Sequence, residues 1–310
     1  TRVRSSAASD VYKRQVDEEG GSVDRLRAFD GPHPAAAMLG ADDSTATTYA
    51  AYATIAEQMR SLGMNVDLAP DADIELVAGP DQGTRTFGAT PQRVTQMVSA
   101  ALDGLQQNGV VGTLKHFPGL GAASIDAHLG LPVITRTRRQ IEAVELAPYR
   151  ALINSGQAQV IMTTDLLMPA LDPHLPAELS PTIINGVLRH DLGYQGVVMT
   201  DALYMKGITD TYSVSEAGVL ALLAGDDLLV GPMHWEVMAD MVNAIHQALT
   251  TGRLTKARLD QSVRRILLLK LHMGLLHRPT HAVVPALGAG WVNWVGAVAL
   301  HDALAPRRTA

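Results

Sequence analysis

Residues 90–119, TPQRVTQMVSAALDGLQQNGVVGTLKHFPG, decide the fold because they contain one complete helix–strand unit. Thr90 is a typical helix cap, Pro91 suits the first helical turn, and the apolar residues that follow recur on one face. The helix ends at an Asn-Gly pair. The run VVGTLKHF (110–117) is apolar enough for a strand covered on both faces, as in a parallel sheet. The stretch therefore predicts an amphipathic helix that leads into a buried parallel strand.

The same kind of unit recurs along most of the chain. Repeated strand–helix units fit either a closed (β/α)8 barrel or an open, doubly wound sheet. The open sheet that binds nucleotides needs a G-x-G-x-x-G turn or a G-x-x-x-x-G-K-[ST] loop, and the sequence has neither. We therefore predict an α/β fold of the (β/α)8 TIM-barrel type. The further strands are expected at MNVDLAP (64–70), AQVIMTTDLL (158–167), GVVMTDAL (196–203) and DDLLVGP (226–232), and the further helices at 46–62, 138–154, 181–191, 214–224, 235–250 and 256–273.

Composition limits the partners of the protein. The net charge of −6 over 310 residues, with scattered Lys and Arg, argues against nucleic acid and anionic membranes as main partners. Cysteine is absent, which excludes disulfides and thiolate metal sites. There is no H-E-x-x-H motif, and the histidines are dispersed, so we expect neither a metal nor a cofactor. Residues 282–300 carry no charge, but they include proline, asparagine and glycines, and we expect no membrane span there.

In a barrel, chemistry belongs to residues at the carboxyl ends of the strands. Asp201 ends the apolar run GVVMT, where a carboxylate could attack an electrophilic carbon or cap the next helix. Lys115 and His116 end another strand and could grip oxygen atoms of a ligand or form a structural ion pair. The barrel rule selects as candidates Asp17, Asp67, Asp73, Lys115, His116, Asp165, Asp201 and Asp227.

The loop after Lys115-His116 contains Asp126-Ala127-His128. A carboxylate two residues from a histidine can accept its ring N–H and make the imidazole a competent proton shuttle. The alternative is an exposed loop histidine without a chemical role.

Together these segments resemble family 3 glycoside hydrolases, in the branch of bacterial β-N-acetylglucosaminidases that act on cell-wall fragments. The matching segments occur in the family's order and cover residues 16–276. They are VDEEGGSVDRL (16–26), GMNVDLAPDADI (63–74), RTFGATPQRV (85–94), GVVGTLKHFPG (109–119), IDAHLGLPVI (125–134), PALDPHLPAELSPTIINGVLRHDLGYQGVVMTDALYMKGI (169–208) and AGDDLLV (224–230).

The resemblance implies roles for eight residues. Asp201 matches the nucleophile in the family's S/T-D-x-L-x-M motif, His128 matches an acid/base histidine, and Asp126 matches the carboxylate partner of that histidine. The Asp-x-His loop separates this branch from the family's β-glucosidases, which use a carboxylic acid from a further domain. The positions that hold the N-acetylglucosamine ring in the family are matched by Asp17, Arg25, Arg85, Lys115 and His116.

Three positions depart from the family pattern. Leu120 replaces a His in K-H-F-P-G-H-G, and Ser22 replaces an Arg after E-G-G. We expect both changes to weaken contacts with the sugar or an attached peptide. Asp165 stands where a His is common in M-T-A-H. We expect it to add a negative charge near the barrel mouth, which would favour a cationic transition state or displace an anionic substrate.

The resemblance also divides the chain. Residues 1–15 do not resemble the family, residues 16–276 form the catalytic barrel domain, and residues 277–310, with Trp291 and Trp294, do not continue the family pattern. We therefore expect a barrel that lacks its first strand–helix unit in this chain, with an open edge that weakens it.

The expected activity is retaining hydrolysis of terminal β-N-acetylglucosaminides by double displacement through a covalent glycosyl-enzyme. Histidine suits the acid/base role because its unperturbed pKa of ~6.5 lies near working pH. Two alternatives stay open: a β-glucosidase-type member, and a catalytically impaired barrel that only binds sugar. We expect a monomer that takes a small carbohydrate. The aglycone, the compartment, and water or phosphate as acceptor stay open.

Overall fold

The computed structural model describes residues 15–79, 83–231 and 234–276. The leader expected at 1–15, apart from Gln15, and the tail expected at 277–310, with its uncharged segment 282–300, lie outside the described residues.

Six parallel strands form the central sheet, and they neighbour one another in the order in which they occur along the chain. This arrangement is a half-barrel of the (β/α)8 type, which confirms the predicted fold class. Within the described residues no strand pairing joins the last of these strands to the first, so the sheet is open on that side. The strands are β1 (Gln15–Val16), β4 (Val66–Asp67), β5 (Val111–Phe117), β6 (Val160–Thr163), β7 (Val197–Ala202) and β8 (Leu228–Val230), and a separate hairpin consists of β2 (Glu18–Gly20) and β3 (Val23–Asp24).

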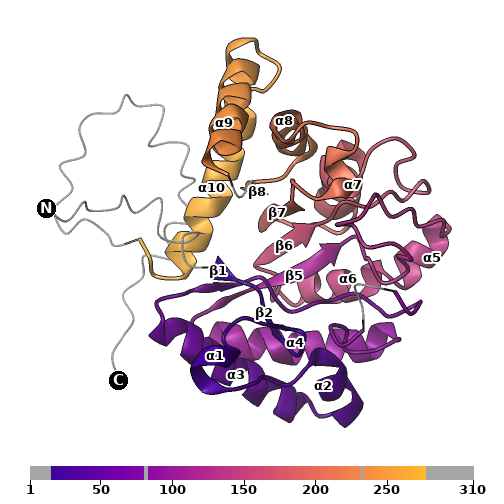
Figure 1. Cartoon of the computed structure of the whole chain (residues 1–310), viewed down its shortest axis with the longest axis vertical. Coiled ribbons are helices and arrows are strands. Elements are labelled where there is room, and N and C mark those ends of the chain that lie inside the picture. The colour runs from indigo at the N-terminus through magenta and orange to yellow at the C-terminus, as the bar shows by residue number, and fades with distance from the viewer. Residues whose placement is uncertain (1–14, 80–82, 232–233, 277–310) are drawn as a thin grey trace, which may run out of the picture. The chain divides into compact units, whose positions relative to one another are not determined.

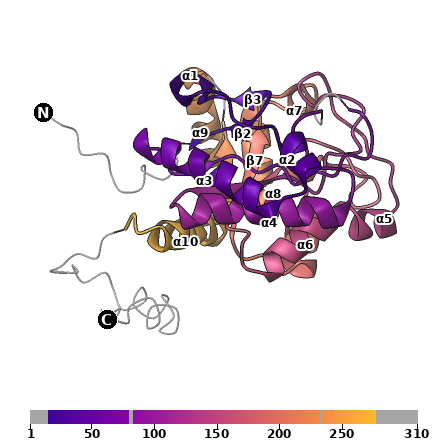
Figure 2. The same cartoon turned by 90° about the horizontal axis from the view of Figure 1, so that it is seen from below.

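Helices pack on the outer face of the sheet, and Figures 1 and 2 both show α3 lying beside α4. Most predicted helices begin and end within a residue or two of their expected bounds. The helices are α1 (Arg27–Asp30), α2 (Ala36–Asp42), α3 (Thr45–Ser61), α4 (Pro91–Gln107), α5 (Arg138–Ala143), α6 (Leu146–Asn154), η2 (Ala177–Leu179), η3 (Thr182–Asp191), α7 (Lys206–Thr209), α8 (Val214–Ala224), α9 (Trp235–Thr250) and α10 (Lys256–His272).

Two of the helices differ from the prediction. The helix expected at 138–154 is two helices, α5 and α6, and α5 has its own capping box between Thr137 and Gln140. The helix expected at 181–191 is wound as a π-helix, η3. The apolar pattern alone predicts neither the break between α5 and α6 nor the i→i+5 hydrogen bonding of a π-helix.

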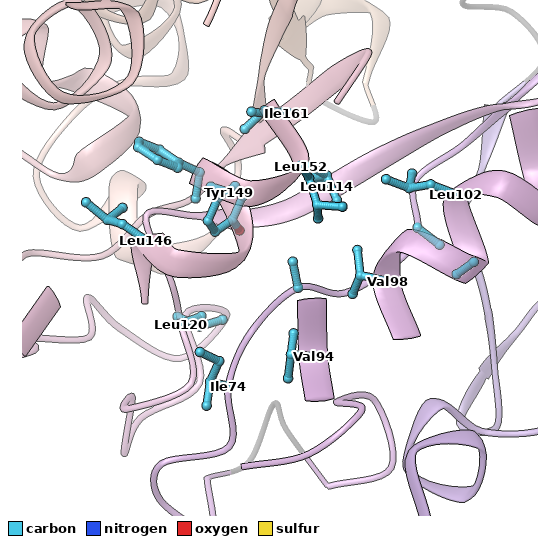
Figure 3. Packing of buried hydrophobic residues seen from close by; sticks show 14 of the residues in the cluster. Ile74, Val94, Val98, Leu102, Leu114, Leu120, Leu146, Tyr149, Leu152 and Ile161 are labelled. Atoms are coloured by element: carbon cyan, nitrogen blue, oxygen red, sulfur yellow. The ribbon is translucent and has the colours of Figure 1, made fainter. Parts of the chain in front are cut away.

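The alternation of side chains along each strand creates two apolar cores. Leu114 of β5, Ile161 of β6 and Val198 of β7 face outward and pack with α4 and α6, as the close view in Figure 3 shows for the first two. The predicted stripe of α4 is buried in this outer core. An inner core on the other face of the strands consists of Val66, Leu68, Val111, Val160, Met162, Val197, Met199 and, from α10, Leu269.

A polar cluster joins α10 to the start of β8. The Asp227 carboxylate accepts hydrogen bonds from Arg265 at 2.9 Å, from Ser262 at 2.6 Å and from Arg189 at 2.7 Å. Asp227 precedes β8, so it lies at the amino end of its strand, away from the mouth. Its selection as a candidate for chemistry was wrong, because the strand begins one residue after it.

Among the described residues, no helix combines the length and the apolar character needed to cross a membrane.

Candidate active site

A cavity of about 280 Å³ opens at the carboxyl ends of the strands. This is the end at which barrel enzymes carry their chemistry. A second cavity, of about 220 Å³, lies near the amino ends of β6 and β7 beside α10. Seven of the eight predicted site residues line the first cavity: Asp17, Arg25, Arg85, Lys115, His116, His128 and Asp201. The eighth, Asp126, contacts the cavity through His128.

Asp201 lies in β7 with a half-buried side chain. The Ala202 backbone N–H donates to its Oδ1 at 2.7 Å, and the Thr164 hydroxyl lies 3.5 Å from its Oδ2. The helix that follows begins at Lys206 and is capped by Met205, so Asp201 is not a helix cap. The carboxylate is therefore held at a strand end with its oxygens at the cavity.

The Asp126-x-His128 pair forms in the structure. The His128 Nδ1 lies 2.8 Å from Asp126 Oδ1, and the His128 backbone N–H donates to the same oxygen at 2.8 Å. With the Nδ1 proton directed at the carboxylate, Nε2 is left to exchange a proton with a ligand. The imidazole is 64% exposed, so it is open to solvent and ligand.

The backbone of Ala127 fixes this loop next to β7, the strand that carries Asp201. The Gly207 N–H donates to the Ala127 carbonyl at 3.0 Å, and the Ala127 side chain packs with Ala202 and Met205. The loop and the end of β7 thus share one apolar contact, which places the Asp-x-His segment beside Asp201.

Glu19 is the centre of the charged wall of the cavity. Its Oε1 lies 2.6 Å from Lys115 Nζ, and its two oxygens accept a bidentate pair from Arg85 at 2.7 and 2.8 Å. Lys115 Nζ also lies 3.0 Å from Asp17 Oδ1. Burial alone would raise the pKa of Glu19, but Lys115 and Arg85 hold it well below its usual range. The sequence analysis did not select Glu19, although Glu19 directly precedes the Gly20-Gly21 turn.

His116 is oriented from behind by a carboxylate. Its Nδ1 lies 2.7 Å from Asp73 Oδ2, and its Nε2 lies 3.4 Å from an Arg85 nitrogen. Burial lowers the pKa of His116, but the charge of Asp73 outweighs it and the pKa is raised. Burial together with the nearby Asp73 raises the pKa of Asp71 to about 8. Asp73, selected from the strand-end rule, therefore acts on the cavity through His116.

The three departures from the family pattern have different surroundings. Leu120 is buried and lines the cavity, and its backbone N–H donates to Asp73 Oδ1 at 2.6 Å. The Ser22 hydroxyl lies 3.0 Å from that of Thr84. Asp165 is fully buried and does not line the cavity. Its side chain lies beneath the mouth against Gly207, with Oδ1 3.4 Å from the hydroxyl of Thr164, which lines the cavity, so the expected charge near the mouth stays a prediction.

Two groups in the described part of the chain have the composition of a metal site: Glu18, Asp24 and His33, and Asp71, Asp73 and His116. In each group the histidine Nδ1 already lies within hydrogen-bond distance of a carboxylate oxygen, at 3.1 Å from Asp24 and 2.7 Å from Asp73. The sequence analysis did not anticipate these groups, because no metal-binding motif links His33 to Asp24, 9 residues before it, or His116 to Asp73, 43 residues before it.

Residues 12–269 match the glycosyl hydrolase family 3 N-terminal domain. The chain belongs to glycosyl hydrolase family 3. This family 3 chain is 33% identical over 278 residues to β-hexosaminidase A of Pseudoalteromonas piscicida, a match that covers 82% of the chain and 46% of the relative. It is 37% identical over 265 residues to β-hexosaminidase LpqI of Mycobacterium tuberculosis, covering 82% of the chain and 67% of the relative.

A solved family 3 structure has the same fold. The β-N-acetylglucosaminidase of a Paenibacillus species superposes with a TM-score of 0.82 at 36% identity, covering 89% of the chain and 53% of that protein. The family 3 chain thus spans about half the length of this protein and of the first relative. The predicted family is confirmed, and the homologues are glycoside hydrolases.

Proposed function

We propose that this family 3 chain carries the catalytic site of a retaining β-N-acetylglucosaminidase. The observation that supports the proposal is that Asp201 and His128 line one cavity while Asp126 binds the Nδ1 of His128. A carboxylate and a proton-exchanging group on one sugar-sized opening are the two parts that double displacement requires. The names of the relatives, β-hexosaminidase and β-N-acetylglucosaminidase, favour an N-acetylhexosamine as the sugar.

In the first step, an Asp201 oxygen attacks the anomeric carbon, and the bond from that carbon to the leaving oxygen breaks. His128, protonated on both nitrogens, gives its Nε2 proton to the leaving oxygen. The Asp126 carboxylate stabilises the imidazolium and keeps the Nδ1 proton in place. The products of this step are a glycosyl ester on Asp201 and the released alcohol.

In the second step, neutral His128 takes a proton from the acceptor, whose oxygen attacks the anomeric carbon and releases Asp201. Two inversions at the same carbon retain its configuration. The acceptor is water in a hydrolase and phosphate in a phosphorylase.

The charged wall of the cavity would hold the sugar hydroxyls. Lys115 and Arg85 offer N–H donors, and Asp17 offers acceptors. Because the carboxylates of Glu19 and Asp17 together balance the two cations, the wall binds a neutral sugar without leaving a buried charge unpaired. Terminal N-acetylglucosaminides of cell-wall fragments are the proposed substrates.

Covalent trapping with an activated fluoroglycoside tests the proposal. We expect a mass increase equal to one fluorosugar on the peptide that contains Asp201, and none in Asp201→Ala. A folded protein that binds the sugar without forming the adduct would instead be a sugar-binding barrel. A panel of nitrophenyl glycosides separates an N-acetylglucosaminidase from a β-glucosidase by the preferred sugar.

The role of His128 has its own measurement. We expect His128→Ala to lose ~100- to 10,000-fold in rate on glycosides with poor leaving groups, and far less on nitrophenyl glycosides. Equal losses on both kinds of substrate would contradict acid catalysis by His128.

A further inference from the structure

A second carboxyl group lies directly behind the proposed nucleophile. Glu178, in the short helix η2, is fully buried. Its Oε2 accepts the backbone N–H of Asp201 at 3.1 Å, and its own N–H donates to the Thr164 carbonyl at 3.3 Å. Glu178 is therefore tied both to the residue proposed to attack the sugar and to the end of the neighbouring strand.

Thr164 connects the same two elements from the side. Its hydroxyl lies 3.5 Å from Asp201 Oδ2 and 3.4 Å from Asp165 Oδ1. One hydroxyl proton serves two carboxylates, so the hydroxyl cannot hold Asp201 firmly by itself. The hydrogen bond from the Asp201 N–H to Glu178, at 3.1 Å, is shorter than the 3.5 Å contact between the Thr164 hydroxyl and Asp201 Oδ2.

The surroundings of Glu178 are unusually negative. The charged groups that face it are Asp165, Asp201 and Asp226, and none of the ion pairs within the described residues includes Glu178. Burial and these three carboxylates raise its pKa well above the usual range. A buried carboxyl in this position stays protonated, because an unpaired buried charge is costly.

We propose that Glu178 is a positioning residue for the nucleophile: its buried carboxyl accepts the Asp201 backbone N–H and leaves the Asp201 carboxylate facing the sugar. The inference rests on the proposed function, in which Asp201 is the nucleophile. As a neutral acceptor, Glu178 fixes the end of β7 without repelling the charge of Asp201. Loss of its proton as pH rises would place a second charge beneath the site and push the two carboxylates apart.

Trapping with a dinitrophenyl fluoroglycoside isolates this effect from His128. An Asp201 oxygen bonds to the anomeric carbon, and dinitrophenolate leaves with the electron pair of the broken bond, so no proton is needed from a general acid. The rate constant for adduct formation and the dissociation constant of the probe are measured separately from the concentration dependence, between neutral and alkaline pH.

Glu178→Gln keeps a neutral acceptor for the Asp201 N–H, whereas Glu178→Leu removes it. We expect Glu178→Gln to trap the probe within a few-fold of the parent rate at neutral pH and to lack the fall in rate that the parent shows at alkaline pH. We expect Glu178→Leu to trap about 10- to 100-fold more slowly with an unchanged dissociation constant, because the attacking oxygen is misplaced.

Asp226→Asn is the matched control, since it neutralises another fully buried carboxyl that bonds to Thr163 and not to the Asp201 backbone. It should keep the parent rate at neutral pH and still show a fall as pH rises, moved to lower pH because one of the carboxyls that raise the pKa of Glu178 is gone. A parent-like alkaline fall in Glu178→Gln, or a parent-like rate in Glu178→Leu, would overturn the inference while leaving the proposed function intact. If Glu178→Leu does not fold, the pH dependence of the trapping rate of Glu178→Gln tests the inference by itself. Absence of any adduct on Asp201 in the parent would remove the proposed function and this inference with it.

Discussion

At the scale of single residues, the site combines a carboxylate held firmly with a histidine whose ring is bound at Nδ1 and otherwise open to solvent. The Asp201 backbone N–H donates to Glu178 and its Oδ1 accepts from the Ala202 N–H, whereas the His128 ring is bound through Nδ1 and is 64% exposed. This difference fits the roles proposed for Asp201 as nucleophile and for His128 as acid and base. The attacking oxygen needs a fixed line to the anomeric carbon, while the proton carrier has to serve two different oxygens in turn.

Asp126→Asn tests whether the contact between Asp126 and His128 Nδ1 contributes to catalysis. The amide can still contact Nδ1, but it no longer carries the charge that stabilises an imidazolium. We expect kcat on a poor leaving group to fall by ~100-fold or more with little change in KM. Steady-state kinetics with the parent and with Asp126→Asn measure the effect. An unchanged kcat would exclude Asp126 from the proposed dyad.

Glu19→Gln tests the charged wall. Lys115 and Arg85 would lose their shared counter-charge while buried, so we expect about 3 kcal/mol or more of lost unfolding free energy at neutral pH. Because the pKa of Glu19 is depressed in the folded state, its contribution is present above the ordinary pKa and is lost as pH falls. Urea unfolding at pH 7 and at pH 4 should therefore show a smaller difference at the lower pH. A difference that grows as pH falls would contradict the ion-pair account.

The sequence predicted most residues of the site but not how they are supported. Strand ends and the family motif selected Asp201, Lys115 and His128, since their positions follow from the order of strands in a barrel. Glu19 and Glu178 were missed, because each contacts its partners across 23 or more residues of the chain. Asp165 was predicted to place a charge near the barrel mouth, and its side chain is buried in the turn after β6. Local pattern does not determine which way a side chain points after a strand ends.

At the scale of elements, the short helix α7 connects β7, which carries Asp201, to the loop that carries Asp126 and His128. It follows β7 after a turn, and the N–H of its second residue, Gly207, binds the Ala127 carbonyl. A Cβ on Gly207 would come within 2.2 Å of Asp165 Oδ2 and 2.9 Å of Asp165 Cγ. Glycine is required here because the helix lies against a buried carboxyl.

Gly207→Ala therefore should shift α7 and the loop that it holds. We expect a loss of about 1–3 kcal/mol in unfolding free energy from overpacking, and a fall in kcat through displacement of the His128 loop. Gly186→Ala, in η3, is the control, since a Cβ there meets nothing within 4 Å. It should leave kcat unchanged and the melting temperature equal or higher. Melting temperature and kcat are measured for both variants. Equal values for Gly207→Ala and Gly186→Ala would refute the packing argument.

At the scale of the whole molecule, the described half-barrel buries several carboxyl groups that resist ionisation. Burial raises the pKa of Asp67, Asp71, Glu178 and Asp226. The α/β class and the order of elements followed from periodicity alone. The gathering of these buried acids could not be predicted from periodicity, because it depends on which strand ends become neighbours in the fold.

These groups make stability depend on pH in one direction. A carboxyl whose folded pKa lies above its unfolded value stabilises the fold fully only below the unfolded value, and this contribution is lost as pH rises through the folded pKa. For Asp71 the window runs from about 4 in the unfolded chain to about 8 in the folded protein. Stability should therefore decline across that window.

Asp71→Asn removes the ionisation and keeps an oxygen that can accept the Asp73 N–H, which the carboxylate binds at 2.7 Å. The melting temperature of the variant relative to the parent should therefore become more favourable by several degrees between pH 5 and pH 8, and should change little above that. Asp42→Asn, at an exposed carboxylate of α2, supplies the baseline for removing one negative charge. If the difference between Asp71→Asn and the parent stays constant from pH 5 to pH 9, Asp71 is already ionised in the fold. In that case Asp71, and not Asp73 alone, would supply the charge that holds the proton on His116.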